Sequence, residues 1–464
     1  MSQPHFQHHH AALSVAKFGG TSVVDYAAMQ RCAKLVASRP QVRLVVVSAS
    51  AGVTNALVAL GNQPDAAERQ AQLDTIRRIQ MGICRPLNEP EIATQIQCWI
   101  DELTTLAEMG PQSSDLAAWR DQILAFGERF SSLLFSRILN RELSQHGGAA
   151  CFDVRQVMRT DSQHGKAIPQ QESIRALCQG ALLPRLSQQV IVTQGFVGAD
   201  GNGYTTTLGR GGSDYSAALL AAGIGAQEVE IWTDVPGIFS TDPRLCDGAR
   251  AIREISFAEA AELATFGAKV LHPATLIPAV ANDIAVFVGS SREPALGGTR
   301  ILASTEERPL VRAVALRRQQ TLVTVHSMNM LHATGFLAEV FAILARHAIS
   351  VDLVTTSEVS IALTLDEAGS SANGHALLTD EVLAELGQLA RVEVERNLAL
   401  VAVIGNDVHR SGAVSEHTFA TVVPDPVRMI CQGASPHNLC FLVDEAAADQ
   451  VVRRVHDRFL SQPA

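Results

Sequence analysis

The chain has 464 residues, which at roughly 150 residues a domain predicts about three domains. Lysine and arginine number 37 against 47 aspartate and glutamate residues, and the resulting formal net charge of −10 argues against nucleic acid or an anionic membrane as a main partner. Hydrophobic residues make up 47% and charged residues 18% of the chain, a globular balance that excludes extensive disorder.

The beginning of the chain gives no targeting signal. MSQPHFQHHH carries no lysine or arginine before an apolar run, and the longest apolar stretch, 217–226, is too short for a transmembrane helix. We therefore expect a cytoplasmic protein with a solvated, histidine-containing tail. Eight cysteines are scattered without a Cys-x-x-Cys pair, which predicts reduced, buried thiols and no zinc or other metal site.

From residue 13 to about 300, short β-branched runs alternate with helical stretches. The runs are LSVAKF, VRLVVVS, QVIVTQGF, EVEIW and IAVFV, and the helical stretches are 24–38, 55–140, 213–224 and 256–266. This alternation predicts an α/β domain, with a mostly parallel central sheet and helices on both faces, over 13–300. Ligands of such sheets bind at the carboxyl ends of the strands. A stretch rich in proline, glycine and charge, 294–312, marks the end of this domain.

The rest of the chain contains an internal repeat. LVTVHS at Leu322 matches LVAVIG at Leu400, and SIALTLD at Ser360 matches NLCFLVD at Asn438, with the same offset of 78 residues. Each copy has the order of a ferredoxin-like βαββαβ unit, and we place the two units at 312–394 and 395–464. Periodicity alone favours no more than a role in bracing a dimer.

The first candidate site is the segment KFGGTS, which begins at Lys17. It follows a strand and precedes a helix, so its glycines allow backbone N–H groups to approach an anion, and the helix N-terminus adds a favourable field. A plain tight turn with a capping Thr or Ser explains the same glycines. The lysine two residues before the first glycine favours a phosphate ligand.

Three further segments carry candidate residues. In TTTLGRGGSD, three glycines surround Arg210, a bidentate donor for carboxylate or phosphate, and Asp214 adds the negative charge that an amino acid's ammonium group requires. Asp214 is otherwise an ordinary charge in a first helical turn. The other two segments are WTDVPGIFSTDPR (232–244) and FGAKVLHP (266–273). Neither requires a function, because turns explain the proline and glycine residues of the first and a favourable charge at a helix C-terminus explains the lysine of the second.

Together and in this order, KFGGTS, SASAGVTN, TTTLGRGGSDY, WTDVPGI, TDPR and FGAKVLHPAT resemble the amino-acid kinase family and, within it, the aspartokinases. The resemblance runs from about Val15 to the end of the chain. It implies transfer of the γ-phosphoryl group of ATP to the side-chain carboxylate of L-aspartate, giving 4-phospho-L-aspartate, with Mg²⁺ bound mainly through the nucleotide phosphates. This reaction opens the synthesis of lysine, threonine and methionine.

The resemblance also implies roles for single residues. Those matching the family's aspartate site are Thr54, Glu128, Arg210, which grips the α-carboxylate, Ser213 and Asp214. Those matching its nucleotide site are Lys17, Phe18, Gly19, Gly20, Thr233, Asp234, Phe239, Arg244, Lys269 and Val270. Phe239 departs from the tyrosine of many relatives, so stacking is kept and a hydroxyl hydrogen bond is lost. Because the attacking carboxylate is already ionised, we expect Lys17 and Lys269 to act by neutralising charge, and no general base is needed.

The two repeats resemble paired ACT domains, which bind amino acids and regulate enzymes. MLHATGFLAEV and SVDLVTTSEVS in the first copy are similar to the lysine-sensitive aspartokinases. The implied site for L-lysine as allosteric inhibitor comprises Met330, Gly335, Phe336, Leu337, Ser350, Val351, Asp352, Ser357 and Glu358. The second copy differs in these places, so lysine is expected in the first alone. An exposed ACT sheet edge predicts a homodimer, with a tetramer left open. Because the sequence ends soon after the second repeat, we expect no homoserine dehydrogenase domain of the kind that bifunctional relatives have.

Two alternatives remain at this stage. One is a catalytically silent amino-acid-binding regulator on the same fold, and the other is an aspartokinase regulated by threonine. The joint presence of lysines suited to ATP and of Arg210 and Asp214 suited to aspartate favours catalysis. Asp352 and Glu358 favour lysine as the inhibitor, because threonine has one ammonium group and leaves one carboxylate unpaired.

Overall fold

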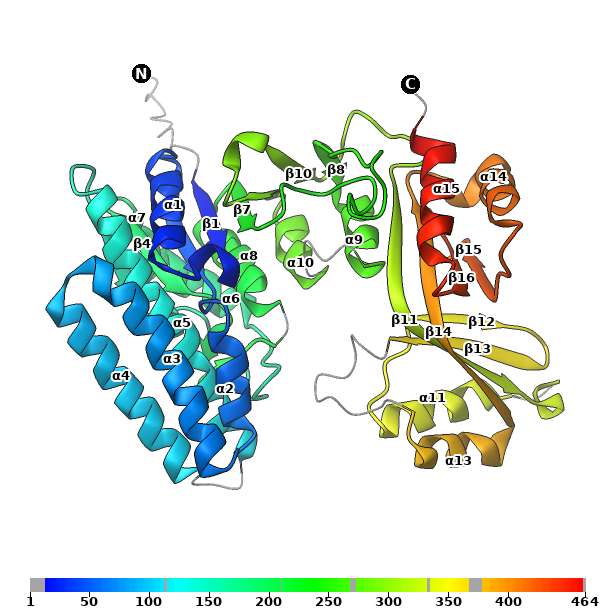
Figure 1. Ribbon diagram of the computed structural model, residues 1–464, viewed down its shortest axis with the longest axis horizontal. Coiled ribbons are helices and arrows are strands. Elements are labelled where there is room, and N and C mark those ends of the chain that lie inside the picture. Colours follow the sequence, from blue (N-terminus) through cyan, green and yellow to red (C-terminus); the bar gives the residue numbers. More distant parts are fainter. Residues whose placement is uncertain are drawn as a thin grey trace, which may run out of the picture. The chain divides into compact units, whose positions relative to one another are not determined.

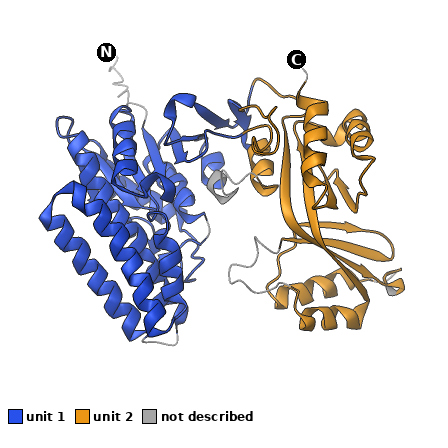
Figure 2. Cartoon of the chain, viewed as in Figure 1, with its two compact units in different colours: residues 1–238, 252–257, 269–305 blue, residues 239–251, 258–268, 306–464 orange. Residues whose placement is uncertain are grey.

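A computed structural model describes residues 13–111, 115–209, 211–267, 273–331, 334–366 and 378–461. The chain divides into two compact units (Figure 2). The first consists of Met1–Ile238, Ile252–Phe257 and Lys269–Thr305, and the second of Phe239–Ala251, Ala258–Ala268 and Glu306–Ala464. Two short segments before residue 306 therefore already belong to the second unit, and no feature of the sequence predicts this division.

The described part of the first unit is built on an eight-stranded sheet in the order β3-β4-β2-β1-β7-β9-β10-β8. Its strands are β1 (Ser14–Phe18), β2 (Val42–Val47), β3 (Ala149–Phe152), β4 (Val190–Gln194), β7 (Glu228–Thr233), β8 (Glu254–Ser256), β9 (Ala285–Ser290) and β10 (Gly298–Leu302). All pairs from β3 to β9 are parallel, and β10 is antiparallel to β9. β1 and β4 are buried along their whole length, as expected of strands covered on both faces. The predicted mostly parallel sheet is confirmed.

The helices of the first unit are α1 (Tyr26–Ala37), α2 (Val53–Gly61), α3 (Ala66–Leu87), α4 (Pro90–Met109), α5 (Leu116–Glu142), α6 (Gln171–Leu177), α7 (Leu183–Leu186), α8 (Gly212–Ile224) and α10 (Pro273–Ala281), while α9 (Phe257–Thr265) passes into the second unit. The long helical region predicted at 55–140 contains four of them, because Pro64, Asn88 in a left-handed conformation and Gly110 interrupt it. α3, α4 and α5 pack side by side (Figure 1). A short hairpin, β5 (Val197–Ala199) with β6 (Thr205–Thr207), precedes α8.

The second unit contains one antiparallel sheet whose described strands have the order β12-β13-β11-β14-β16-β15. They are β11 (Ala313–His326), β12 (Leu353–Thr356), β13 (Ser360–Asp366), β14 (Arg391–Ile404), β15 (Met429–Gln432) and β16 (Asn438–Asp444). Its helices are α11 (Phe336–Arg346), α13 (Asp380–Leu389), α14 (Gly412–Val422) and α15 (Ala448–Leu460). Each repeat packs its helices on its own apolar core, one around Val323 and Leu363 and one around Val401 and Phe441.

The two repeats exchange halves of their long strands. Residues 320–326 of β11 pair with β13 and with the beginning of β14, whereas residues 313–317 pair with 400–404 at the end of β14. The second repeat therefore takes its last strand from the beginning of β11, ahead of the whole first repeat. A domain boundary at 394/395 follows the sequence repeat, but strand pairing in the sheet joins residues from the two sides of this boundary.

Across the described ranges, no helix combines the length and the apolar character that a bilayer span requires.

A buried ion pair fastens α9 to this sheet. Glu259 is fully buried, and its Oε1 accepts hydrogen bonds from Arg312 Nε at 3.0 Å and from Asn406 Nδ2 at 2.8 Å. Arg312 directly precedes β11, and Asn406 follows β14 by two residues. This one carboxylate therefore joins α9 to the paired ends of both long strands.

We expect Glu259→Ala to lower the stability of the second unit by about 3–5 kcal/mol, because it leaves the Arg312 guanidinium buried without its carboxylate. The urea midpoint of the second unit, followed by circular dichroism, measures this loss. Glu393→Ala is the matched control, since it removes an ion pair with Arg391 in which both side chains are exposed, at a cost of about 1 kcal/mol or less. Equal midpoint shifts in the two variants would contradict the assignment.

Candidate functional site

The turn after β1 lies against two neighbouring strand ends. Gly19 N–H donates to Trp232 O at the end of β7, and Ala51 N–H, beyond β2, donates to Gly20 O, both at 3.1 Å. A Cβ on Gly20 would lie 2.8 Å from Ala49 O, so only glycine allows this approach. The turn continues as a short 3-10 helix, Gly20–Val23.

The predicted helix 24–38 begins only at Tyr26, where the side chain of Asp25 accepts from Ala28 N–H at 2.7 Å. The N-terminus of α1 is therefore capped by its own aspartate, two residues beyond the predicted start, whereas the 3-10 helix that begins at Gly20 has no side-chain cap. The backbone of the turn itself is what remains to approach an anion.

Lys17 is the central charge of this region. It is 8% exposed, and its Nζ lies 2.5 Å from Asp214 Oδ1 in the first turn of α8. α8 starts directly after Gly211, which has a φ of +74°. A Cβ on Gly195, just beyond β4, would lie 2.6 Å from Ser213 Cβ, so this glycine allows the N-terminus of α8 to reach the strand ends. The fold thus brings Lys17, Ser213 and Asp214 together.

Glu128 reaches the same region from α5. Its Oε1 accepts from Ala49 N–H at 3.0 Å, and Gly127 permits the contact because a Cβ there would lie 2.7 Å from Ala49 Cβ. Burial raises the pKa of Glu128 to about 7, while its hydrogen bonds and the charge of Lys17 act in the opposite direction. Thr54 lies exposed in the first turn of α2, four residues beyond Ser50 in the same SASAGVTN segment.

The predicted nucleotide residues are divided between the two units. Thr233 ends β7, next to β1, and is followed by the exposed Asp234. Phe239 and Arg244 belong to the second unit, where Arg244 is exposed and pairs with Asp242 at 2.6 Å between Nη2 and Oδ2. The predicted Arg210, Lys269 and Val270 lie outside the described residues.

Sequence reasoning missed Asp121, a buried carboxylate on α5. It accepts hydrogen bonds from Thr207 N–H at 3.2 Å, from Thr207 Oγ1 at 2.5 Å and from Gly165 N–H at 3.1 Å, and it pairs with His164 Nδ1 at 2.8 Å. It thereby fixes the end of β6, from which the chain enters the GRGG segment. The available signal was its position seven residues before Glu128, which places both acids on the same face of α5.

The residues predicted to bind lysine lie in the first repeat. Gly335, with a φ of +92°, precedes the free N-terminus of α11, whose first residues are Phe336 and Leu337. Met330 ends a short 3-10 helix just before it. Ser357 forms the turn between β12 and β13, donating its N–H to Ser360 O at 2.8 Å.

Asp352 is not a free carboxylate. Its Oδ2 lies 3.3 Å from Arg317 Nη2, and Arg317 also pairs with Asp366. Burial raises the pKa of Asp352, and Arg317 opposes this effect. Ser350 and Val351 precede it, so these residues lie before β12, whereas Glu358 follows β12, about 20 Å of extended chain away.

What the first unit offers chemically is a buried ammonium group at the carboxyl ends of parallel strands, with two carboxylates beside it. Lys17 supplies the positive charge, and Asp214 and Glu128 supply the negative charges, one ion-paired and one raised in pKa. Such an arrangement suits a small ligand that carries both signs of charge together with a transferable anion.

Comparisons with known proteins agree with this geometry. The model of the amino acid kinase family matches residues 12–290, and an ACT domain model matches residues 401–459. The lysine-sensitive aspartokinase 3 of Escherichia coli K12 is 55% identical, over 95% of this chain and 98% of that protein. The chloroplastic aspartokinase 1 of Arabidopsis thaliana is 33% identical, over 96% of this chain and 80% of that protein.

Two solved structures are similar over nearly the whole chain. The crystal structure of E. coli aspartokinase III in complex with aspartate and ADP, in the R-state, superimposes with a TM-score of 0.87 at 55% identity, covering 97% of this chain and 100% of that one. The complex of the same enzyme with lysine and aspartate, in the T-state, gives 0.84 at 54% identity, covering 97% and 99%.

The pKa of Glu128 leads to a prediction on stability. Because the native pKa is about 7 and the ordinary value is 4.5, the native state binds more protons than the unfolded state between these values, so Glu128 makes the protein less stable as pH rises through this window. We expect the free energy of unfolding of Glu128→Gln to rise relative to that of the wild type between about pH 5 and about pH 8, by up to about 3 kcal/mol. The difference is measured as a shift of the urea midpoint of the variant to higher urea concentration. Glu91→Gln, at an exposed position, should follow the wild type at both values of pH. Parallel behaviour of Glu128→Gln and the wild type would place the pKa of Glu128 in the ordinary range.

Proposed function

We propose, since this chain belongs to the amino acid kinase family and within it to the aspartokinases, that it transfers the γ-phosphoryl group of ATP to the side-chain carboxylate of L-aspartate, releasing 4-phospho-L-aspartate and ADP. The observation that carries the proposal is the buried Nζ of Lys17 at the end of β1, paired with Asp214. The E. coli enzyme that was solved with aspartate and ADP supports the assignment of both ligands. ADP release that depends on both ATP and aspartate, in a coupled assay, tests it.

The proposed chemistry needs charge neutralisation more than proton transfer. Aspartate's carboxylate is ionised at neutral pH and attacks the γ-phosphorus directly, so the barrier comes from bringing two anions together. Lys17 neutralises the phosphoryl group in flight, and the backbone N–H groups of the turn from Gly20 onward contact the phosphates, since Gly19 N–H already donates to Trp232 O. Asp214 holds the Lys17 ammonium in place and receives the substrate's ammonium group.

In this proposal aspartate is held by residues from one loop and three helices. Arg210 grips the α-carboxylate as a bidentate donor, in the loop that Asp121 fastens to α5 through Thr207. Ser213 on α8 and Thr54 on α2 complete the pocket together with Glu128. The positions of Ser213 and Glu128 beside Lys17 support this set.

We assign the nucleotide to Phe18, Thr233, Asp234, Phe239, Arg244, Lys269 and Val270, in addition to Lys17 and the glycine turn. Phe239 stacks on the nucleotide without the hydroxyl hydrogen bond of many relatives, and Lys269 adds a second positive charge at the phosphates. Mg²⁺ arrives with the nucleotide, bound mainly through phosphate oxygens and water, where it neutralises phosphate charge. The carboxylates nearest the glycine turn support this, since Asp214 is engaged by Lys17 and Glu128 by Ala49 N–H.

L-lysine is the proposed allosteric inhibitor, bound at the first repeat. The 55% identical relative is named as lysine-sensitive, and its structure was solved with lysine. Because Asp352 and Glu358 lie at opposite ends of β12, one lysine reaches both only if a second copy of the chain brings its own end of β12 alongside. We therefore propose that the lysine site lies in a homodimer of ACT repeats, and pairs of such dimers would give a tetramer.

We place the enzyme in the cytoplasm. All eight cysteines fall within the described residues and are free thiols, and most of them are buried. A reducing compartment is where such a set is expected.

Two substitutions separate the substrate site from the phosphoryl site. Arg210→Ala should raise the KM for aspartate steeply, by roughly 2–4 kcal/mol in binding, because a charge-assisted bidentate pair is lost, and should change the KM for ATP little. Lys17→Ala should instead lower kcat, as expected of a charge used most in the transition state. An unchanged KM for aspartate would remove Arg210 from the pocket, and a near-normal kcat would make the KFGGTS turn structural only.

For lysine inhibition the informative substitution is Asp352→Ala. We expect this variant to keep full activity without lysine and to lose inhibition at millimolar lysine, because one ammonium group of the inhibitor loses its carboxylate. Glu381→Ala removes an exposed acid of the same repeat, on α13, and should remain inhibited. Equal inhibition of all three enzymes, or stronger inhibition of the wild type by threonine, would refute the regulatory assignment without touching the kinase assignment.

A further inference from the structure

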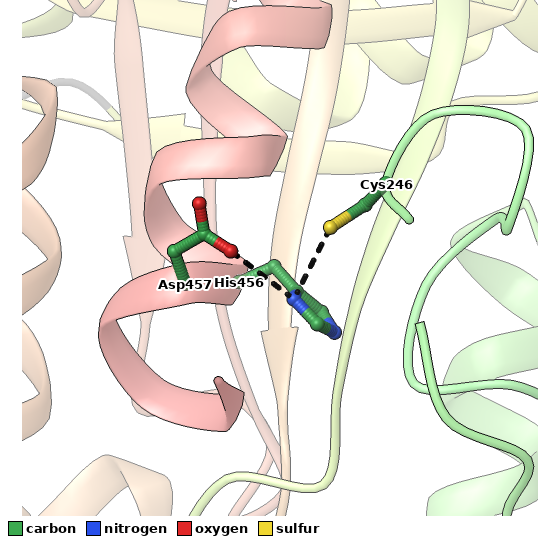
Figure 3. Close-up of side chains that lie close together, drawn as sticks. All are labelled: Cys246, His456 and Asp457. Carbon is green, nitrogen blue, oxygen red and sulfur yellow. Dashed lines mark hydrogen bonds and ion pairs between the residues drawn. The ribbon is translucent and has the colours of Figure 1, made fainter. Parts of the chain in front are cut away.

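A cysteine, a histidine and an aspartate gather in the second unit, in a part of the molecule that the proposed function does not use. Cys246 lies in the loop 239–251, and His456 and Asp457 are neighbours on α15 (Figure 3). His456 Nδ1 lies 3.4 Å from Cys246 Sγ and 3.9 Å from Asp457 Oδ1, and the three donor atoms are all within 4.8 Å of one another.

These separations are close to those of ligands on one tetrahedral metal ion. With Zn–S near 2.3 Å and Zn–N and Zn–O near 2.0–2.2 Å, tetrahedral angles put sulfur and nitrogen about 3.6 Å apart and nitrogen and oxygen about 3.4 Å apart. The 3.4 Å between Cys246 Sγ and His456 Nδ1 is therefore already close to the separation of two ligands of one zinc ion. The Asp457 oxygen has to come about half an ångström closer to Nδ1 and, because it lies within 4.8 Å of the sulfur where a tetrahedral site needs about 3.6 Å, up to about 1 Å closer to Sγ. The Asp457 side chain is 62% exposed, which leaves room for this shift.

The imidazole ring is oriented by a contact on its other nitrogen. His456 Nε2 lies 2.9 Å from Ser240 Oγ, which also accepts from Arg250 N–H at 2.9 Å. This hydrogen bond directs Nδ1 toward Cys246 and Asp457, as the outer partners of metal-binding histidines do. Ser461 Oγ donates to Asp457 Oδ1 at 2.8 Å and steadies the carboxylate in the same way.

The loop that carries Cys246 is also held in place. Cys246 N–H donates to Asp242 O at 3.2 Å, and Arg453 of α15 donates to Leu245 O at 2.6 Å. Gly248 borders the two buried donors, since a Cβ there would lie at ordinary contact distance, 3.6 Å from His456 Cε1 and 3.7 Å from Cys246 Sγ.

We propose that Cys246, His456 and Asp457 bind one Zn²⁺ ion, with water as the fourth ligand. On binding, the Cys246 thiol releases its proton to solvent and ligates as the thiolate, while His456 ligates through Nδ1. The ion ties the loop 239–251 to α15. Cys246 and His456 are 210 residues apart, so no spacing rule applied to the sequence finds the pair.

Equilibrium dialysis of the full-length protein against Zn²⁺, followed by metal analysis, tests the site. His5, His8, His9 and His10 are first replaced by alanine, so that a histidine-rich segment does not contribute metal binding of its own. We expect about one zinc per chain in this background and in Cys98→Ser, which removes an exposed cysteine elsewhere. Cys246→Ser and His456→Gln should weaken binding at least tenfold, as should the exposed Asp457→Asn, which leaves the buried packing untouched.

Co²⁺ in place of Zn²⁺ gives a second readout. A thiolate-to-cobalt charge-transfer band together with tetrahedral visible bands is expected in the parent and in Cys98→Ser, and the charge-transfer band should vanish in Cys246→Ser. Zinc binding of equal strength in Cys246→Ser and Cys98→Ser would overturn the proposal, as would the lack of a charge-transfer band in the parent.

Discussion

The active-site end of the first unit depends on keeping one ammonium group charged in a nearly buried position. An unpaired charge at Lys17, which is 8% exposed, would be costly, so its stability rests on Asp214 at 2.5 Å. That contact requires α8 to begin at the ends of β1 and β4, and the glycines at 195 and 211 make this possible, one by removing a clash and the other by a positive φ. The arrangement of strand ends and helix starts is therefore built around the charge that the proposed phosphoryl transfer uses.

Helix α5 places two buried carboxylates in different environments. Asp121 has four hydrogen-bonding contacts and holds β6 and the loop around Gly165 in position. Glu128 accepts from Ala49 N–H, and burial raises its pKa to about 7. Burial also raises the pKa of Asp121, whose hydrogen bonds hold the end of β6 in place. One helix thus carries a carboxylate that fixes the loop beyond β6 and the carboxylate that the proposed function assigns to the aspartate site.

The two repeats of the second unit share the long strands β11 and β14. β11 and β14 each contribute one half to each repeat, so a displacement of either strand in the first repeat is also a displacement in the second. Glu259 on α9 is joined through Arg312 and Asn406 to the ends of these same strands. A ligand at the first repeat that favours one arrangement of the strands therefore acts on α9 through covalent continuity and a buried ion pair.

The sequence alone determined the parallel sheet, the two repeats, the charged segments and the family, because strand alternation, repeat offset and glycine-rich motifs are local patterns that survive without knowledge of the fold. Only the tertiary structure decided that the repeats exchange strand halves, that Asp121 supports the site, that Arg317 pairs with Asp352, and that Cys246 meets His456. Each of these is a contact between residues far apart in the chain, and such contacts leave no spacing in the sequence. The N-terminus of α1 shows the same limit at short range, since the side chain of Asp25 caps the helix at Tyr26, two residues beyond the predicted start at residue 24.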